Sequence, residues 1–137
     1  MRLRVVVVSL LVLAFATLAV AEDKTKAAEL ASEAWLKFVD SGDYSQSWME
    51  ASSLFKAAVT QQQWEQKVRA ARQPLGALIS RNLKSAQYTT TLPGAPDGQY
   101  VVIQYDTSFA NKKSAIETVT PMLDKDGQWR VSGYFIK

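Results

Sequence analysis

Residues 114–136 read SAIETVTPMLDKDGQWRVSGYFI. Residues that favour strands alternate on both sides of residues 124–127, so the pattern predicts two strands, 114–123 and 128–136. Residues 124–127 fit a type I turn followed by a left-handed glycine, Gly127. If Asp124 pairs with Gln128, the predicted facing pairs are Leu123 with Trp129, Pro121 with Val131, Val119 with Gly133 and Glu117 with Phe135. One face of this hairpin is then apolar apart from Glu117.

The same alternation extends toward the N-terminus. Residues 83–92 and 99–109 read as two further strands, with turns at 93–98 and 110–113. A three-residue loop at 111–113 continues the apolar face through Phe109, Thr107, Tyr105, Ile103 and Val101, and it leaves Gln104 and Asp106 on the other side. The two hairpins agree on which face is apolar, and a slip of one residue would mix the faces. We therefore expect a four-stranded antiparallel meander.

The first half of the mature chain has helical spacing. Apolar residues recur every three or four positions over 25–39, and Gly42 ends this stretch. Capping-box signatures predict two later helix starts, Asp43 with Gln46 and Thr60 with Gln63. The second helix is expected to break near Ser52 and Ser53, and the third to end at Pro74 and Gly76. Helices packed on one face of a curved meander predict an α+β roll.

The first 21 residues have the order of a secretory signal peptide. Arg2 and Arg4 precede an apolar run from Val5 to Val20, and the small residues Ala19 and Ala21 mark the expected cleavage site. The run has 16 residues, fewer than the roughly 20 that a membrane-spanning helix needs. We therefore expect a signal peptide over 1–21, a single domain over 22–137, and no stable membrane anchor after cleavage.

Composition excludes much chemistry. The 137 residues include no cysteine and no histidine, which rules out disulfides, thiolate nucleophiles, a lipoprotein-type anchor and Ser-His-Asp triads. The formal charge of +3 falls to +1 once the two leader arginines are removed. With neither a basic stripe nor metal-ligand spacing, we expect no nucleic-acid partner, no metal and no cofactor. The expected location is the bacterial periplasm or the medium.

A set of motifs spread over about 28–137 is familiar. They are Trp35-Leu36, Gly42-Asp43-Tyr44, Trp48, Phe55, Trp64, and the segments 72–76, 92–98, 100–102, 117–122 and 129–134. In these residues the chain resembles the bacterial domain-of-unknown-function family numbered 4019. The resemblance implies a small exported protein with no established activity and a cystatin-like roll, the fold of nuclear transport factor 2 and ketosteroid isomerase. It supplies no catalytic residues, so a step from roll to function is fold-level analogy.

Glu117 is the weak catalytic candidate, because the predicted register puts its carboxyl on the apolar face near Thr107 and Tyr105. A carboxyl there would have a raised pKa and could act as a base or acid. The candidates for lining a ligand pocket are Tyr88, Tyr105, Thr107 and Glu117. The alternative is that Glu117 reaches solvent and pairs with Lys112 or Lys113.

Arg69, Arg72 and Arg81, together with Lys84, form a candidate anion site around the end of the third helix. Arg69 and Arg72 lie three residues apart and share a helical face, so they could clamp a carboxylate or phosphate. The alternative is ordinary helix electrostatics, with Glu65 paired to Arg69 and cations near a helix C-terminus.

These observations favour a non-catalytic exported binding domain of otherwise unknown function. It would hold a small ligand between sheet and helices, or a protein partner, including a second copy, on the open sheet face. That face is expected to carry Gln104, Asp106, Thr118, Thr120, Arg130, Ser132 and Tyr134. One alternative is an isomerase or dehydratase in which Glu117 carries the proton and Tyr105 donates a hydrogen bond. Another is a structural envelope protein that binds no metabolite.

Overall fold

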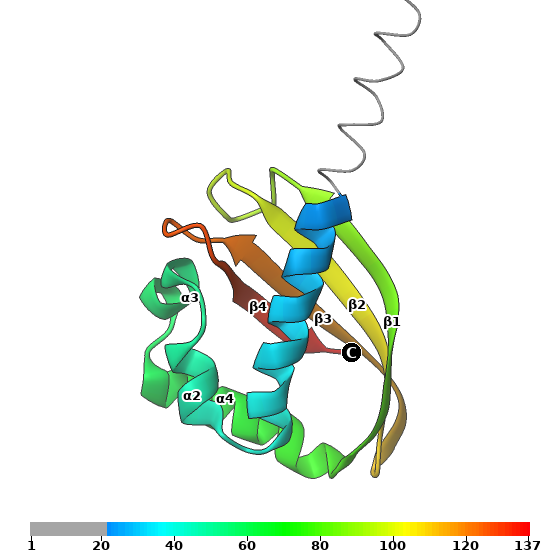
Figure 1. Ribbon diagram of the computed structural model, residues 1–137. Helices are drawn as coiled ribbons and strands as arrows, with labels where there is room; N and C mark the ends of the chain where they lie inside the picture. Colours follow the sequence, from blue (N-terminus) through cyan, green and yellow to red (C-terminus); the bar gives the residue numbers. More distant parts are fainter. Residues whose placement is uncertain (1–21) are drawn as a thin grey trace, which may run out of the picture.

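The computed structural model describes residues 22–137 (Figure 1). The expected signal peptide and its cleavage site at Ala19 and Ala21 lie outside the described residues. An N-terminal helix spans 22–40. It is followed by α2 (Tyr44–Met49), α3 (Ser53–Ala58), α4 (Gln61–Arg72) and a 3₁₀ turn, η1 (Gln73–Leu75). The strands are β1 (Leu78–Thr89), β2 (Tyr100–Phe109), β3 (Lys112–Leu123) and β4 (Trp129–Ile136).

The four strands form one antiparallel sheet in the order β1-β2-β3-β4. The sheet is curved, and the helices lie against its concave side, with the N-terminal helix running across the strands (Figure 1). The α+β class and the meander are thus confirmed, whereas the cystatin-like roll stays a prediction. Within residues 22–137, no helix is both long and apolar enough to cross a membrane.

The helix ends follow the capping signals of the sequence. Thr60 and Gln63 form the complete capping box of α4, and the side chain of Asp43 accepts from the Gln46 amide at the start of α2. The second helical stretch is broken as expected, since Ser52 caps a separate helix, α3. Gly42 has a φ of +77° and ends the N-terminal helix in a Schellman motif, in which the Asp43 amide donates to the Phe38 carbonyl.

Two strands begin earlier than the alternation predicts. β1 starts at Leu78 instead of Leu83, because residues 78–83 pair with the far end of β2. β3 starts at Lys112, and only Ala110 and Asn111 form the loop that was expected to run to Lys113. An irregularity in the pairing between Thr107 and Phe109 compensates for the shorter loop, so the apolar face of β2 still points into the core.

The predicted register of the last hairpin is correct only up to Pro121. Leu123 pairs with Trp129 and Pro121 with Val131, but then Ser132 is an extra residue and Thr120 pairs with Gly133. This β-bulge follows from Pro121, which has no N–H for the ladder and is tolerated in strands chiefly at such irregularities. Beyond it, Val119 pairs with Tyr134, and Glu117 with Ile136.

The bulge exchanges the faces of two aromatic residues. Tyr134 was expected on the open face, but its ring lies inside, 5.4 Å from the ring of Trp35 in an edge-on contact. Phe135 was expected opposite Glu117 in the core, but it is 59% exposed. The prediction for these two residues was therefore wrong, because it assumed regular pairing to the end of the strand. Whether two copies associate through the open face stays a prediction.

Tryptophans anchor the core between helices and sheet. The ring of Trp35 lies 5.9 Å from that of Trp64, which in turn contacts Phe55 edge-on at 4.9 Å. Both indole N–H groups are satisfied at Ser47, with Trp35 donating to its carbonyl at 2.7 Å and Trp64 to its hydroxyl at 2.9 Å. Helix α2 is thereby fixed against the N-terminal helix and α4.

Candidate functional site

Glu117 on β3 lies at the centre of a buried polar network. Its side chain is fully buried, and Oε1 accepts from Arg81 Nε at 2.7 Å and from Thr107 Oγ1 at 2.7 Å. Oε2 accepts from Arg81 Nη2 at 3.2 Å and, in a short hydrogen bond, from the hydroxyl of Tyr134. Each carboxylate oxygen therefore already has two donors.

Arg81 connects Glu117 to a second carboxylate, that of Asp40. Its Nη1 and Nη2 donate to the two oxygens of Asp40 at 2.7 and 2.9 Å, a two-pronged pairing. Nη1 of Arg72 lies 3.0 Å from Asp40 Oδ1. We call these four residues, Asp40, Arg72, Arg81 and Glu117, the buried ion network. Its formal charges cancel.

Each member comes from a different element. Asp40 is the last residue of the N-terminal helix, Arg72 the last of α4, and Arg81 and Glu117 lie on β1 and β3. Arg72 is only 5% exposed, and its guanidinium lies 4.8 Å from the ring centre of Phe109. The network therefore connects the ends of two helices to two strands of the sheet, β1 and β3, which flank β2.

The environment shifts the pKa of the network's donors. Burial and the neighbouring Glu117 carboxylate raise the pKa of Tyr134 well above its usual range. Burial acts to lower the pKa of Arg81, but hydrogen bonds to Asp40 and Glu117 outweigh it, and the net pKa is raised. The hydroxyl and the guanidinium thus keep their protons and donate to the Glu117 side chain. This arrangement suits a structural ion pair better than the proton transfer considered for Glu117.

The pocket candidates do not gather around one opening. Thr107 does lie at Glu117, but the hydroxyl of Tyr105 is directed to Ser32 on the N-terminal helix, at 3.0 Å. Burial raises the pKa of Tyr105, against the effect of this hydrogen bond. Tyr88 lies apart on β1, where it donates to Gln99 at 3.1 Å and has Lys24 5.3 Å from its ring centre.

The arginine candidates divide into two groups. Arg72 and Arg81 meet at Asp40, so a carboxylate of the chain itself occupies the position expected for a bound anion. Arg69 is exposed and lies over the ring of Tyr44, 5.5 Å from its centre. Glu117 pairs with Arg81 and not with Lys112 or Lys113. The sequence analysis did not identify Asp40 as a member of this cluster. Its position was a signal, because negative charge is unfavourable at a helix C-terminus unless a cation lies nearby.

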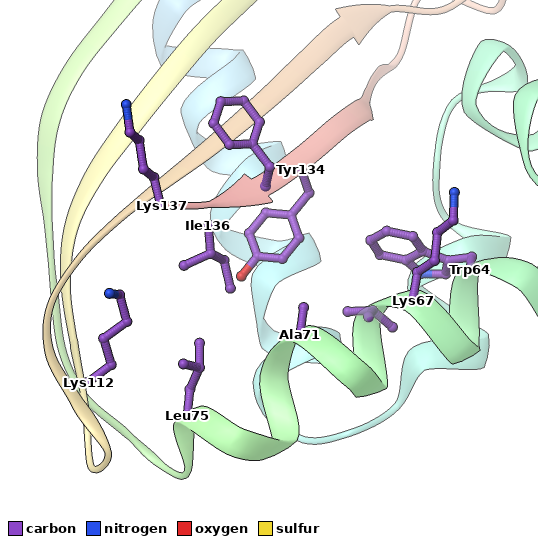
Figure 2. Close-up of a pocket in the computed structure, with 10 residues that line it drawn as sticks. Trp64, Lys67, Ala71, Leu75, Lys112, Tyr134, Ile136 and Lys137 are labelled. Atoms are coloured by element: carbon purple, nitrogen blue, oxygen red, sulfur yellow. The ribbon is translucent and has the colours of Figure 1, made fainter.

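An open hollow lies on the other side of Tyr134. It has a volume of about 490 Å³ and is formed by one side of α4, the end of β4 and the start of β3 (Figure 2). We call it the α4–β4 hollow. Its lining is Trp64, Lys67, Val68, Ala71, Leu75, Lys112, Tyr134, Phe135, Ile136 and Lys137. The sequence left open whether the space between sheet and helices is a pocket or a filled core. It could not locate this opening, because the bulge determines where the end of β4 lies.

The hollow has no acidic lining residue. No group of three or more carboxylate, histidine or cysteine side chains in residues 22–137 is placed to hold a metal ion. The hollow therefore offers apolar contact and positively charged side chains.

Fold and site together define an α+β protein with a buried ion network and an apolar hollow beside it. Residues 31–134 match the family of proteins of unknown function DUF4019. The chain therefore belongs to the DUF4019 family, as its motifs indicated. No curated protein matches it by sequence.

Proposed function

We propose that this protein is a non-catalytic binding domain of the bacterial envelope and that the α4–β4 hollow is its ligand site. The observation that carries the proposal is the hollow itself. Its volume of about 490 Å³ lies within the roughly 300–1,000 Å³ typical of small-molecule sites. Export is proposed from the leader-like order of the first 21 residues.

Binding suits the walls of the hollow better than catalysis. The one phenol on the wall, Tyr134, donates a hydrogen bond to Glu117, and the indole of Trp64 donates one to Ser47. Both polar hydrogens are thus used within the protein. The rest of the inner wall is apolar, with side chains such as Val68, Leu75 and Ile136. Such a surface gains free energy when a ligand removes it from water.

A small side chain keeps the hollow open on the helix side. Ala71 lies on the wall contributed by α4, between Trp64 and Leu75 (Figure 2). A larger residue at this position would fill the space without disturbing the core, because Ala71 is exposed. Its neighbour Ala70 is also exposed and does not line the hollow, so it provides a matched control.

The test is titration with an uncharged naphthylamine dye whose emission rises in apolar surroundings. We expect saturable binding to the purified protein, at least tenfold weaker binding to Ala71→Phe, and unchanged binding to Ala70→Phe. Absence of saturable binding, or equal loss in both variants, would contradict the assignment of the site. Urea unfolding of both variants checks that neither has lost its fold.

A further inference from the structure

We infer that the α4–β4 hollow takes a single-chain amphiphile with an anionic headgroup, of the alkanoate class. This inference rests on the proposed function and specifies its ligand. Two features carry it, the apolar interior of the hollow and the sign of the charge around it. A third feature shows which end of the ligand lies inside. The polar hydrogens of the wall are already hydrogen-bonded within the protein, so the headgroup must lie at the rim.

The interior fits a hydrocarbon chain. Trp64 and Leu75 present apolar surface from α4 and η1, and Ile136 faces them from β4 (Figure 2). Val68 on α4 also lines the hollow. The hollow is open at the surface, so a chain can enter without unfolding an element. A ligand of this shape would gain about 0.8 kcal/mol for each methylene group that it buries.

All the charged side chains of the lining are lysines. Lys112 lies at the end of the hollow near Leu75, and Lys67 lies at the other end beside Trp64 (Figure 2). Lys137 follows Ile136 at the end of β4, and its side chain is directed away from Leu75 (Figure 2). Among the ion pairs formed within residues 22–137, none includes Lys67, Lys112 or Lys137. An anionic headgroup would therefore meet lysine side chains that form no ion pair in the described part of the chain, whereas a cationic one would be repelled.

The headgroup belongs at the rim. A carboxylate placed inside would find no free donor at Tyr134 or Trp64, because their hydrogens are bound to Glu117 and Ser47. Burial of an ion without donors is strongly unfavourable. The chain then lies inside, and the carboxylate lies outside near Lys112, which is half-buried.

The occupant we propose is the free single-chain acid and not a bilayer lipid. The hollow is of the size that holds one small molecule, and its mouth is flanked by lysines at both ends (Figure 2).

The test uses calorimetric titration with hexanoate, octanoate and decanoate, each below its micelle-forming concentration. We expect affinity to rise about fourfold per added methylene group.

The charge is tested with 1-decanol and decyltrimethylammonium, which keep the chain and change the head. Decanoate should bind about threefold more tightly than decanol, which is a typical effect of an exposed ion pair. Decyltrimethylammonium should bind most weakly of the three. Lys112→Gln should abolish the advantage of decanoate over decanol. The matched control is Lys113→Gln, since Lys113 is exposed and lies outside the lining.

The outcomes separate the inference from the proposed function. If decanol binds as tightly as decanoate while Ala71→Phe still blocks both, the anionic class is wrong and the binding site stands. If neither these ligands nor the neutral dye bind, both proposals fail. The protein is also mixed with anionic phospholipid vesicles. If it binds them and decanoate does not compete, the free acid is the wrong occupant and a membrane surface takes its place.

Discussion

Asp40 occupies an unfavourable position for an acidic residue. It is the last residue of the N-terminal helix, where the free carbonyl groups make negative charge unfavourable. Two guanidinium groups offset this, since Arg81 pairs with both of its oxygens and Arg72 lies 3.0 Å away. The helix end therefore depends on residues more than 30 positions later in the chain.

The first prediction concerns Glu117, the buried end of the network. Glu117→Gln keeps the shape but removes the charge that balances Arg81, and breaking a buried ion pair from one side costs about 3–5 kcal/mol. We expect a loss of this size in the free energy of unfolding, measured by urea denaturation at pH 7. Asp106→Asn is the control, because Asp106 is exposed on the outer face and should change stability by less than about 0.5 kcal/mol.

A double variant shows whether the cost comes from the unpaired charge. Combining Glu117→Leu with Arg81→Met removes both members, so stability should be partly recovered relative to Glu117→Leu alone. A Glu117→Gln variant as stable as Asp106→Asn would show that the network contributes little and would reopen a proton-transfer role for this carboxyl.

At the scale of elements, the end of the N-terminal helix depends on one backbone conformation. Gly42 has a φ of +77°, and no atom lies within 4 Å of the position that a Cβ would take. Gly42→Ala should therefore destabilise through backbone strain alone, by about 1–2 kcal/mol, whereas Gly42→Asn should cost less. Urea denaturation of the two variants measures the difference. Equal costs for Ala and Asn would contradict this explanation.

The β3–β4 turn is connected to α3 by one carboxylate. Asp124 accepts from the Ser53 amide at 2.9 Å and from its hydroxyl at 2.6 Å, and these hydrogen bonds lower the pKa of Asp124 to about 2. In the unfolded chain an aspartate has a pKa of about 3.9. The contribution to stability is thus fully present above about pH 4 and is lost as the pH falls through about 2.

This linkage gives a pH-dependent prediction. When the pH falls from 5 to 2, the free energy of unfolding should decrease less in Asp124→Asn than in the unmodified protein, because the variant lacks the Asp124 carboxylate that titrates in this range. Urea unfolding at several pH values tests it, with Asp97→Asn as the control because Asp97 lies in an exposed turn. Parallel pH profiles for the protein and Asp124→Asn would show that the carboxylate contributes nothing in this range.

The sequence specified elements better than it specified contacts between them. Period-two alternation predicted all four strands, and Thr60 with Gln63 gave the start of α4 correctly. The alternation of β2 placed Tyr105 and Thr107 on the inner face, where both are buried. The bulge escaped prediction, although Pro121 and Gly133 are its signals, because a regular register is the default in pattern reasoning. Asp40 escaped because its partners are distant in sequence.

At the scale of the molecule, occupation of the hollow should stabilise the fold. Any ligand that binds only the folded state stabilises it by about 2.7 kcal/mol at one hundred times its Kd. For a domain of this size that corresponds to a rise in Tm of about 10 °C. Decanoate should produce this rise, measured by differential scanning calorimetry. Ala71→Phe should show less than a third of it at the same concentration, and an equal rise in both proteins would contradict binding in the hollow.

The extra residue at Ser132 decides which side chains of β4 point inward. If Ser132 were retained but paired regularly, every side chain after it would turn over, so Phe135 would oppose Glu117 and Tyr134 would face solvent. Deletion of Ser132 would not have this effect, because the pairs beyond the bulge, such as Val119 with Tyr134, would stay the same in a regular ladder. The strand can therefore lose one residue at this point and keep its faces. A residue added here would need a second irregularity, or it would turn the tyrosine of the ion network and one wall of the hollow to the outside.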